Sequence, residues 1–120
     1  MAFISDEVFD QGLDYADTNG TKMDICSSEP ANYAGIAAVT LGNAAVNTAA
    51  PEAGAVDGRR VIIPAITAGT VTASGTATYW ALSNGSSVLI AADTLSTSQA
   101  VIDGNTFTLD ATSITLRDPA

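Results

Sequence analysis

Residues 76–92 read TATYWALSNGSSVLIAA and carry the clearest local structural signal in the chain. Side chains along 76–83 alternate in character, and such a period of two is typical of a β-strand. The pair Asn84-Gly85 then separates this run from a second apolar run at 87–92. Because a type I′ turn requires positive φ at both central residues, Asn-Gly between two such runs predicts a β-hairpin.

The strand-like pattern extends on both sides of this hairpin and makes residues 59–117 a β-rich core. Short runs rich in Val, Ile and Thr are separated there by turn pairs such as Asp103-Gly104. Many short strands at this spacing predict a mainly β fold, an antiparallel β-sandwich or jelly-roll-like domain. The strands are expected at residues 59–66, 70–74, 76–83, 87–92, 100–102, 106–110 and 113–117.

The N-terminal part predicts one α-helix at about residues 5–17. Ser5 is a suitable N-cap, and the acidic residues that follow it complement the helix dipole. An apolar stripe at helical spacing comprises Phe9, Leu13 and Ala16. Thr18-Asn19-Gly20 is expected to end the helix, because Asn and Gly tolerate the left-handed conformation.

Between the helix and the β-rich core the pattern is weaker. Residues 21–27 predict a short strand, with Met23 and Ile25 on one face and Lys22, Asp24 and Cys26 on the other. Residues 31–38 predict a short helical turn and 39–41 a short strand. Residues 42–58 are rich in Ala, Asn, Pro and Gly, and we expect a long loop or extended arm there.

Composition limits the function. The 120 residues are the size of a single domain, 1–120. Thirteen acidic residues against four basic ones give a net charge of −9, so we expect no nucleic-acid partner. Histidine is absent and Cys26 is the one cysteine, which removes the usual general base and zinc ligand and excludes an internal disulfide. We therefore expect a protein that is not an enzyme, with no catalytic, cofactor-binding or metal-binding residues.

Individual motifs leave alternatives open. Cys26 as a nucleophile would need a neighbouring base, and there is no histidine to supply it. Tyr79 and Trp80 are expected on opposite faces of one strand, one in the core and the other over the second face or at an interface. Arg59-Arg60 predicts either pairing with a neighbour's acids or a simple surface pair. The acidic residues of the predicted helix have three interpretations: they form a solvated face, they face a basic partner, or they bind a divalent cation. These residues are Asp6, Asp10, Asp14 and Asp17.

The termini and hydropathy bear on location. No segment reaches the length of a membrane span, so we expect no membrane partner. The first ten residues carry acids where a secretory signal peptide has bases before an apolar run. We therefore expect a chain made in the cytoplasm and not exported by a signal of its own.

Four segments resemble a family of small proteins of tailed bacteriophages and prophages, some of them virion structural proteins. The family's recurring pieces are DICSSEP, GRKV, WALS/TNGS and a terminal DPA. This chain has DICSSEP at 24–30, GRRV at 58–61, WALSNGS at 80–86 and DPA at 118–120. The resemblance implies a virion setting, with the chain made in the host cytoplasm, and supplies no catalytic residues.

On this basis we expect a capsid decoration or cement protein, which stabilises the head through non-covalent contacts across capsomers. Its partner would be the major capsid protein or another virion protein, and symmetry favours a dimer or trimer of the chain. The alternatives are a tail, neck or head-fibre attachment component. From a different class, a carbohydrate-binding or cell-surface-binding β-module would use Trp80 or Tyr79 as its stacking platform.

Overall fold

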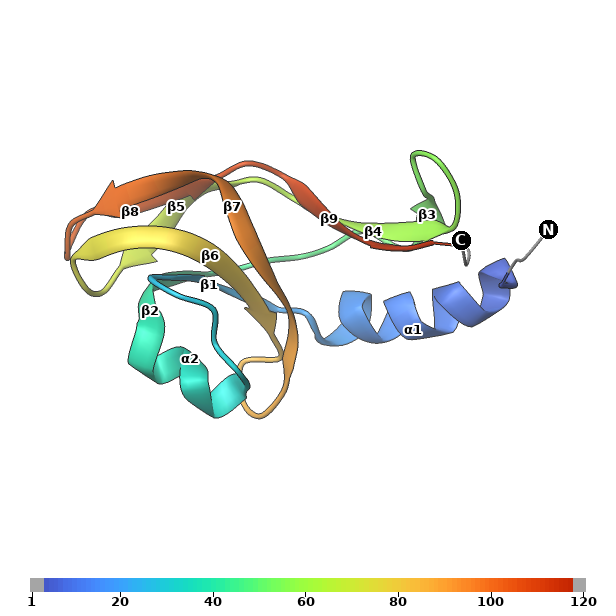
Figure 1. Cartoon of the computed structure of the whole chain (residues 1–120), viewed down its shortest axis with the longest axis horizontal. Coiled ribbons are helices and arrows are strands. Elements are labelled where there is room, and N and C mark those ends of the chain that lie inside the picture. Colours follow the sequence, from blue (N-terminus) through green and yellow to red (C-terminus); the bar gives the residue numbers. More distant parts are fainter. Residues whose placement is uncertain (1–3, 118–120) are drawn as a thin grey trace.

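The structure is a computed structural model that describes residues 4–117 (Figure 1). These residues form two helices, α1 (Asp6–Asn19) and α2 (Tyr33–Val39). The predicted class is confirmed: the fold is mainly β, with a curled antiparallel sheet of the β-sandwich kind and an N-terminal helix. The strands are β1 (Lys22–Cys26), β2 (Thr40–Ala45), β3 (Glu52–Ala53), β4 (Arg59–Ile63), β5 (Ile66–Val71), β6 (Gly75–Ser83), β7 (Leu89–Val101), β8 (Thr106–Leu109) and β9 (Thr112–Leu116).

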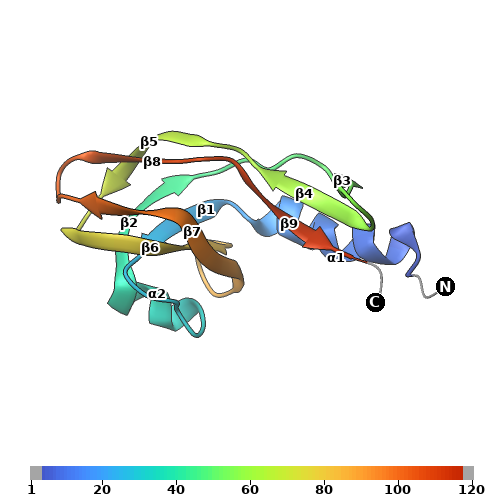
Figure 2. The ribbon, with the colours of Figure 1, turned by 45° about the horizontal axis from the view of Figure 1, so that its top comes forward.

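The larger sheet is antiparallel, with strand order β7-β6-β1-β2-β5-β8. It curls until its two edge strands, β7 and β8, come near each other (Figures 1 and 2). The Gln99 side chain on β7 donates a hydrogen bond to the backbone carbonyl of Thr108 on β8. A side chain therefore bridges the two edges where a closed barrel would have a backbone ladder.

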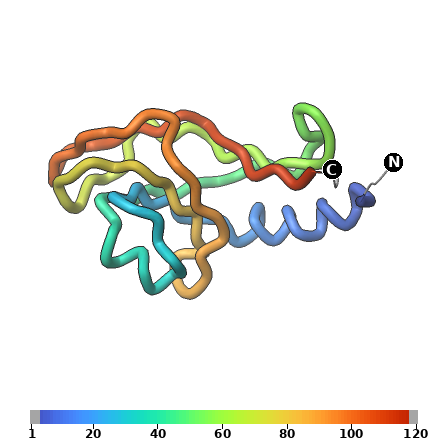
Figure 3. The backbone as a smooth tube through the Cα atoms, in the orientation of Figure 1, coloured from blue at the N-terminus to red at the C-terminus, as the bar shows by residue number. Residues whose placement is uncertain are grey.

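The smaller sheet, β3-β4-β9, lies beside α1 at one end of the elongated molecule (Figure 2). Helix α1 packs on β4 and buries its predicted apolar stripe. We call α1 and this small sheet the arm. The backbone tube shows that α1 and the end of β9, far apart in sequence, lie at the same end of the molecule (Figure 3). The chain is 49 Å along its longest axis and 27 by 23 Å across.

Two apolar clusters lie on the two faces of the larger sheet. Trp80 belongs to the inner cluster, whereas Tyr79 packs on the outer face under α2 with Cys26 and Ile36. The prediction that the two rings face opposite sides is thus confirmed. The inner cluster also receives Ile63 from the small sheet and consists of Met23, Ile25, Leu41, Ile63, Ile66, Val71, Ala77, Trp80, Leu82, Val101 and Phe107.

Two predicted strands, at 87–92 and 100–102, are wrong as separate elements, because β7 runs unbroken from Leu89 to Val101. Thr94 pairs with Tyr79 and Gln99 with Ala77, so residues 95–98 bulge opposite Thr78 alone. A bulge of polar residues is tolerated here because β7 is an edge strand, where one side of the backbone needs no ladder. Polar edge residues erase the apolar alternation that sequence patterns rely on.

The sequence predicts a long loop or an extended segment over residues 42–58. This prediction is wrong for the first part, since residues 42–45 belong to β2. Backbone pairing with β1 on one side and β5 on the other outweighs the weak strand propensity of this segment. A second short strand, β3, pairs with β4. The predicted run 59–66 also divides, because Pro64 separates β4 from β5.

A loop at Asn84-Gly85 and a helix end at Gly20 are both present where the sequence predicts them, but each has a different backbone conformation from the predicted one. Among the described residues no side-chain-bearing residue has positive φ, so Asn84-Gly85 is not a type I′ turn. Residues 84–88 instead form a wider loop closed by a hydrogen bond from the Asn84 amide to the Val88 carbonyl. Gly20 follows α1 with φ −79°, so the helix does not end in the left-handed conformation.

Candidate functional site

Cys26 lies buried on the outer face of β1. Desolvation by burial raises the pKa of its thiol to about 12, and the negative charge of Asp24 adds to the shift. The thiol therefore stays protonated at neutral pH, whereas nucleophilic cysteine chemistry requires the thiolate. Cys26 acts as a small packing residue beneath α2.

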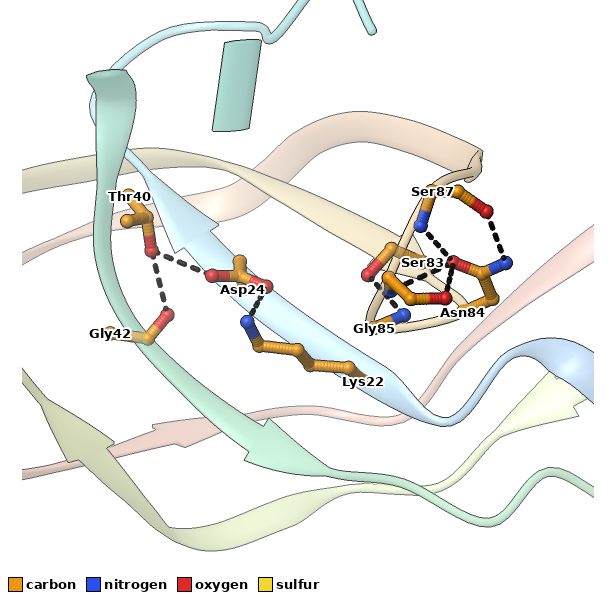
Figure 4. Close-up of polar contacts among 9 residues, drawn as sticks. Lys22, Asp24, Thr40, Gly42, Ser83, Asn84, Gly85 and Ser87 are labelled. Carbon is orange, nitrogen blue, oxygen red and sulfur yellow. Dashed lines mark hydrogen bonds and ion pairs between the residues drawn. The ribbon is translucent and has the colours of Figure 1, made fainter. Parts of the chain in front are cut away.

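Asp24 is the most deeply buried charged side chain of the described residues, at 1% exposure. The Thr40 hydroxyl lies 2.7 Å from its Oδ2 and donates to it, and Lys22 Nζ lies 3.8 Å from Oδ1 (Figure 4). Both partners come from the same outer face of the sheet. Oδ1 has no hydrogen-bond partner among the described residues, so the charge of Lys22 is its compensation, and we interpret the group as structural.

The aspartates of α1 do not form a uniform solvated face. Arg59 on β4 donates to both carboxylate oxygens of Asp10, through Nε at 2.8 Å and Nη2 at 3.3 Å. The Thr48 hydroxyl donates to the carboxylate of Asp17. Asp14 is exposed. Within residues 4–117, no group of three or more acidic or cysteine side chains lies close enough to hold a metal ion.

The paired arginines bind acids of their own chain. Arg59 joins α1 to the small sheet, and its hydrogen bond to Asp10 raises the pKa of the guanidinium above its ordinary value. Arg60 pairs with Glu52 on the neighbouring strand β3. The two arginines thus form ion pairs between elements of the arm. The sequence pattern does not distinguish this arrangement from pairing with acidic residues of a neighbouring molecule.

An apolar groove of about 300 Å³ runs between α1, the beginning of β7 and β9. We call it the arm groove. Tyr15 and Leu116 line it and are 48% and 37% exposed. The Val8, Gly12 and Tyr15 positions form a second stripe on α1, turned by about 100° from the buried stripe. The lining of the arm groove consists of Gly12, Leu13, Tyr15, Ala16, Val88, Leu89, Ile90, Ile114 and Leu116.

A second cleft, of about 500 Å³, opens where the large sheet fails to close. We call it the seam cleft. Its walls come from β7 on one side and from β8 through the start of β9 on the other, and Trp80 lies at its floor. Its lining consists of Met23, Ile63, Pro64, Ile66, Trp80, Thr94, Leu95, Ser96, Thr97, Gln99, Thr108, Leu109, Asp110, Ala111 and Thr112.

Sequence patterns pointed to neither opening as a site. The stripe of Val8, Gly12 and Tyr15 has helical spacing and was the available signal for the arm groove. The sequence predicts that one of Tyr79 and Trp80 lies in the core, and the structure shows that it is Trp80, which is 6% exposed. The seam cleft gathers residues from β1 to β9, which no local pattern brings together.

Comparisons of the chain with protein-family models, with curated proteins and with solved structures found no match. Neither of the two helices in the described part of the chain has the length and apolar character needed to cross a membrane. The terminal DPA segment at 118–120 lies outside the described residues.

Proposed function

We propose that the protein is a bacteriophage virion structural protein, a capsid decoration or cement protein that binds the assembled head non-covalently. The observation that carries this proposal is the arm groove, an apolar surface left uncovered between α1, the beginning of β7 and β9. The resemblance of four sequence segments to tailed-phage proteins supports the virion setting. The acidic net charge supports a position outside the shell, away from DNA.

The occupant of the arm groove in this proposal is a subunit of the phage shell. Tyr15 and Leu116 line the groove and stay partly exposed in the isolated chain, and covering each would contribute about 1 kcal/mol. Glu7 and Asp14 are exposed on the same helix, so the complementary surface is an apolar patch flanked by basic side chains.

The strength of attachment comes from repetition. One groove offers only a modest contact, because association also costs translational and rotational freedom. A dimer or trimer of the chain on a symmetric shell engages several sites at once and gains effective concentration. If those sites exist only on the assembled lattice, binding stabilises that lattice by mass action.

The same surface would serve a tail, neck or head-fibre attachment component, which is the alternative. The two positions differ in stoichiometry: a decoration protein matches the number of shell subunits or capsomers, whereas a neck or fibre component forms one small ring or trimer. Quantitative mass spectrometry of purified particles measures that ratio. Absence of the chain from purified particles would contradict both positions.

The arm groove itself is tested by binding to undecorated heads. We expect Tyr15→Glu and Leu116→Glu to reduce cosedimentation with heads at least tenfold, since each places a charge in the contact. Ile102→Glu is the matched control: Ile102 is 63% exposed and lies in the turn between β7 and β8, at the other end of the molecule. Wild-type binding by both groove variants would overturn the role of the groove. Self-association lost in those variants, with binding to heads retained, would assign the groove to a second copy of the chain.

A further inference from the structure

The seam cleft exists because the curled sheet stops short of closing. β7 and β8 are the two edges of the sheet, and between them the Gln99 side chain reaches the Thr108 carbonyl. Residues 95–98 bulge out of the β7 ladder beside this bridge. The two walls are thus joined by a side chain and not by a backbone ladder, and the lining includes residues of the inner core.

The floor of the cleft is apolar. Trp80, Met23, Ile63 and Ile66 all line it, and all belong to the inner cluster. Trp80 and Ile66 are 6% and 8% exposed and Met23 and Ile63 1%, so a small part of each side chain meets the cleft. An occupant therefore meets a small apolar surface at depth, to which Trp80 contributes.

The walls carry many polar side chains beside Leu95 and Leu109 and are almost uncharged. No lysine or arginine lines the cleft, so nothing there neutralises a phosphate, sulfate or carboxylate group of a ligand. Seven side chains in the lining carry a hydroxyl, an amide or a carboxylate: Thr94, Ser96, Thr97, Gln99, Thr108, Asp110 and Thr112.

We propose that the seam cleft binds a neutral saccharide of one or two sugar units. A sugar ring combines an apolar C–H face with hydroxyls around its rim, which matches an apolar floor under hydroxyl-bearing walls. Asp110 can accept hydrogen bonds from sugar hydroxyls, and the Thr and Ser hydroxyls can both donate and accept. The volume lies within the usual range of small-molecule sites, which is roughly 300 to 1,000 Å³.

Other ligand classes fit this lining less well. An acyl chain would cover the wall hydroxyls without replacing their hydrogen bonds to water, which costs free energy for each. An acidic sugar or a nucleotide would face Asp110 and the net charge of −9 without a cation in the lining. The proposal does not depend on the arm groove or on a virion role.

The chain has one tryptophan, so its fluorescence reports on this cleft. Glucose, galactose, mannose, N-acetylglucosamine, lactose, maltose and chitobiose would be titrated to tens of millimolar. Saturation-transfer NMR on each sugar would serve as a second readout. We expect at least one neutral sugar to change Trp80 emission in a saturable manner and to receive saturation from the protein.

Thr97→Val and Thr112→Val keep the shape of the wall and remove one hydroxyl each. We expect each to raise Kd by about fivefold, and the double variant more, because a polar group of the sugar is then left unpaired. Thr115→Val is the matched control, since Thr115 is exposed on the same strand as Thr112 and does not line the cleft. Thermal unfolding curves would confirm that each variant is folded.

Three outcomes would overturn the proposal. The first is that none of the seven sugars gives either signal. The second is binding that the two Thr→Val variants leave unchanged, which places the sugar elsewhere. The third is stronger binding of glucuronic acid, sialic acid or decanoic acid, which assigns the cleft to another ligand class.

Discussion

Arg59 on β4 and Asp10 on α1 lie 49 positions apart in the chain and form an ion pair with two hydrogen bonds. Arg59 also donates to the backbone carbonyl of Pro51, in the segment that leads into β3. One guanidinium thus joins the helix, the small sheet and the connecting segment of the arm. The planar fork of the guanidinium matches the two carboxylate oxygens of Asp10.

We therefore expect Arg59→Lys to destabilise the arm although it keeps the positive charge. A lysine offers one ammonium group in place of the planar fork, so the two-bond geometry is lost. The measurement is thermal unfolding of Arg59→Lys, Asp10→Asn and the double variant. Their effects should be less than additive, because either change alone removes the same pair.

Arg60→Lys is the control for this prediction. Arg60 pairs with Glu52, which is largely exposed at the two-residue strand β3, so its loss should shift the unfolding midpoint less. Both shifts should shrink at high salt, since neither pair is fully buried. Strict additivity of Arg59→Lys and Asp10→Asn would show that the pair contributes no coupling.

Cys26 makes stability depend on pH in the alkaline range. Its pKa is about 12 in the folded chain, against an ordinary value of 9.0, so the unfolded chain loses this proton first. The stabilising contribution is fully present below pH 9.0 and declines as the pH rises toward about 12. Each unit of difference in pKa between the folded and the unfolded chain corresponds to about 1.4 kcal/mol.

The measurement is the free energy of unfolding of the wild type and of Cys26→Ala between pH 8 and 11. We expect the free energy of unfolding of the wild type to fall relative to that of Cys26→Ala as the pH rises above 9.0. Titrations of lysine and tyrosine side chains occur in both proteins and cancel in this difference. The folded wild type should also resist a thiol reagent at pH 8 and react after denaturation. Fast labelling of the native protein would contradict the burial of this thiol.

The sequence predicted those parts of the fold whose signal is local. Alternation along 76–83 and the helical stripe of Phe9, Leu13 and Ala16 depend only on neighbouring residues, and both elements are present. The long strand β7 was missed because its bulged edge carries Ser and Thr where apolar alternation would be needed. β2 was underestimated because its pairing partners, not its composition, keep it extended.

The two openings were beyond such patterns for a different reason. The seam cleft brings Met23 and Thr112 to one lining, and their proximity follows from how far the sheet curls. The sequence holds part of the signal for the arm groove, since Val8, Gly12 and Tyr15 repeat at helical spacing. Nothing in the helix alone shows that Leu116 from the other end of the chain completes that surface.

Asn84 organises the loop between β6 and β7 through its side chain. Its Oδ1 accepts hydrogen bonds from the backbone amides of Ser86, Ser87 and Val88, at 3.0, 2.8 and 3.0 Å. Figure 4 shows the contact between Asn84 and Ser87. We expect Asn84→Ala to lower the free energy of unfolding by about 1–2 kcal/mol, because three amides lose their acceptor.

The conservative variant Asn84→Asp keeps the accepting oxygen and should retain most of the stability. Urea unfolding monitored by Trp80 fluorescence measures both, with Ser86→Ala as a control in the same loop, since the Ser86 hydroxyl makes only a long contact of 3.5 Å. A loss in Asn84→Asp equal to that in Asn84→Ala would show that the acceptor oxygen is not what closes the loop.

Gly20 and Gly104 are required for different reasons, which alanine substitution separates. Gly20 has an ordinary φ of −79°, but an added Cβ would meet the backbone carbonyl of Ala16 and lie 2.9 Å from Cδ2 of the buried Leu82. Gly104 has φ +90° with nothing within 4 Å of an added Cβ, so only backbone strain opposes a side chain there. We expect Gly104→Ala to cost about 1 kcal/mol and Gly20→Ala about 2 kcal/mol or more.

A further substitution, Leu82→Ala, separates crowding at position 20 from backbone strain at position 104. Leu82→Ala alone destabilises the core, yet it removes the side chain that an added Cβ at position 20 would crowd. Gly20→Ala should therefore cost less in the Leu82→Ala background than in the wild type, while Gly104→Ala should cost the same in both. Equal costs of Gly20→Ala in the two backgrounds would mean that the Ala16 carbonyl alone requires the glycine, and the end of α1 would then be set within the helix rather than by packing on β6.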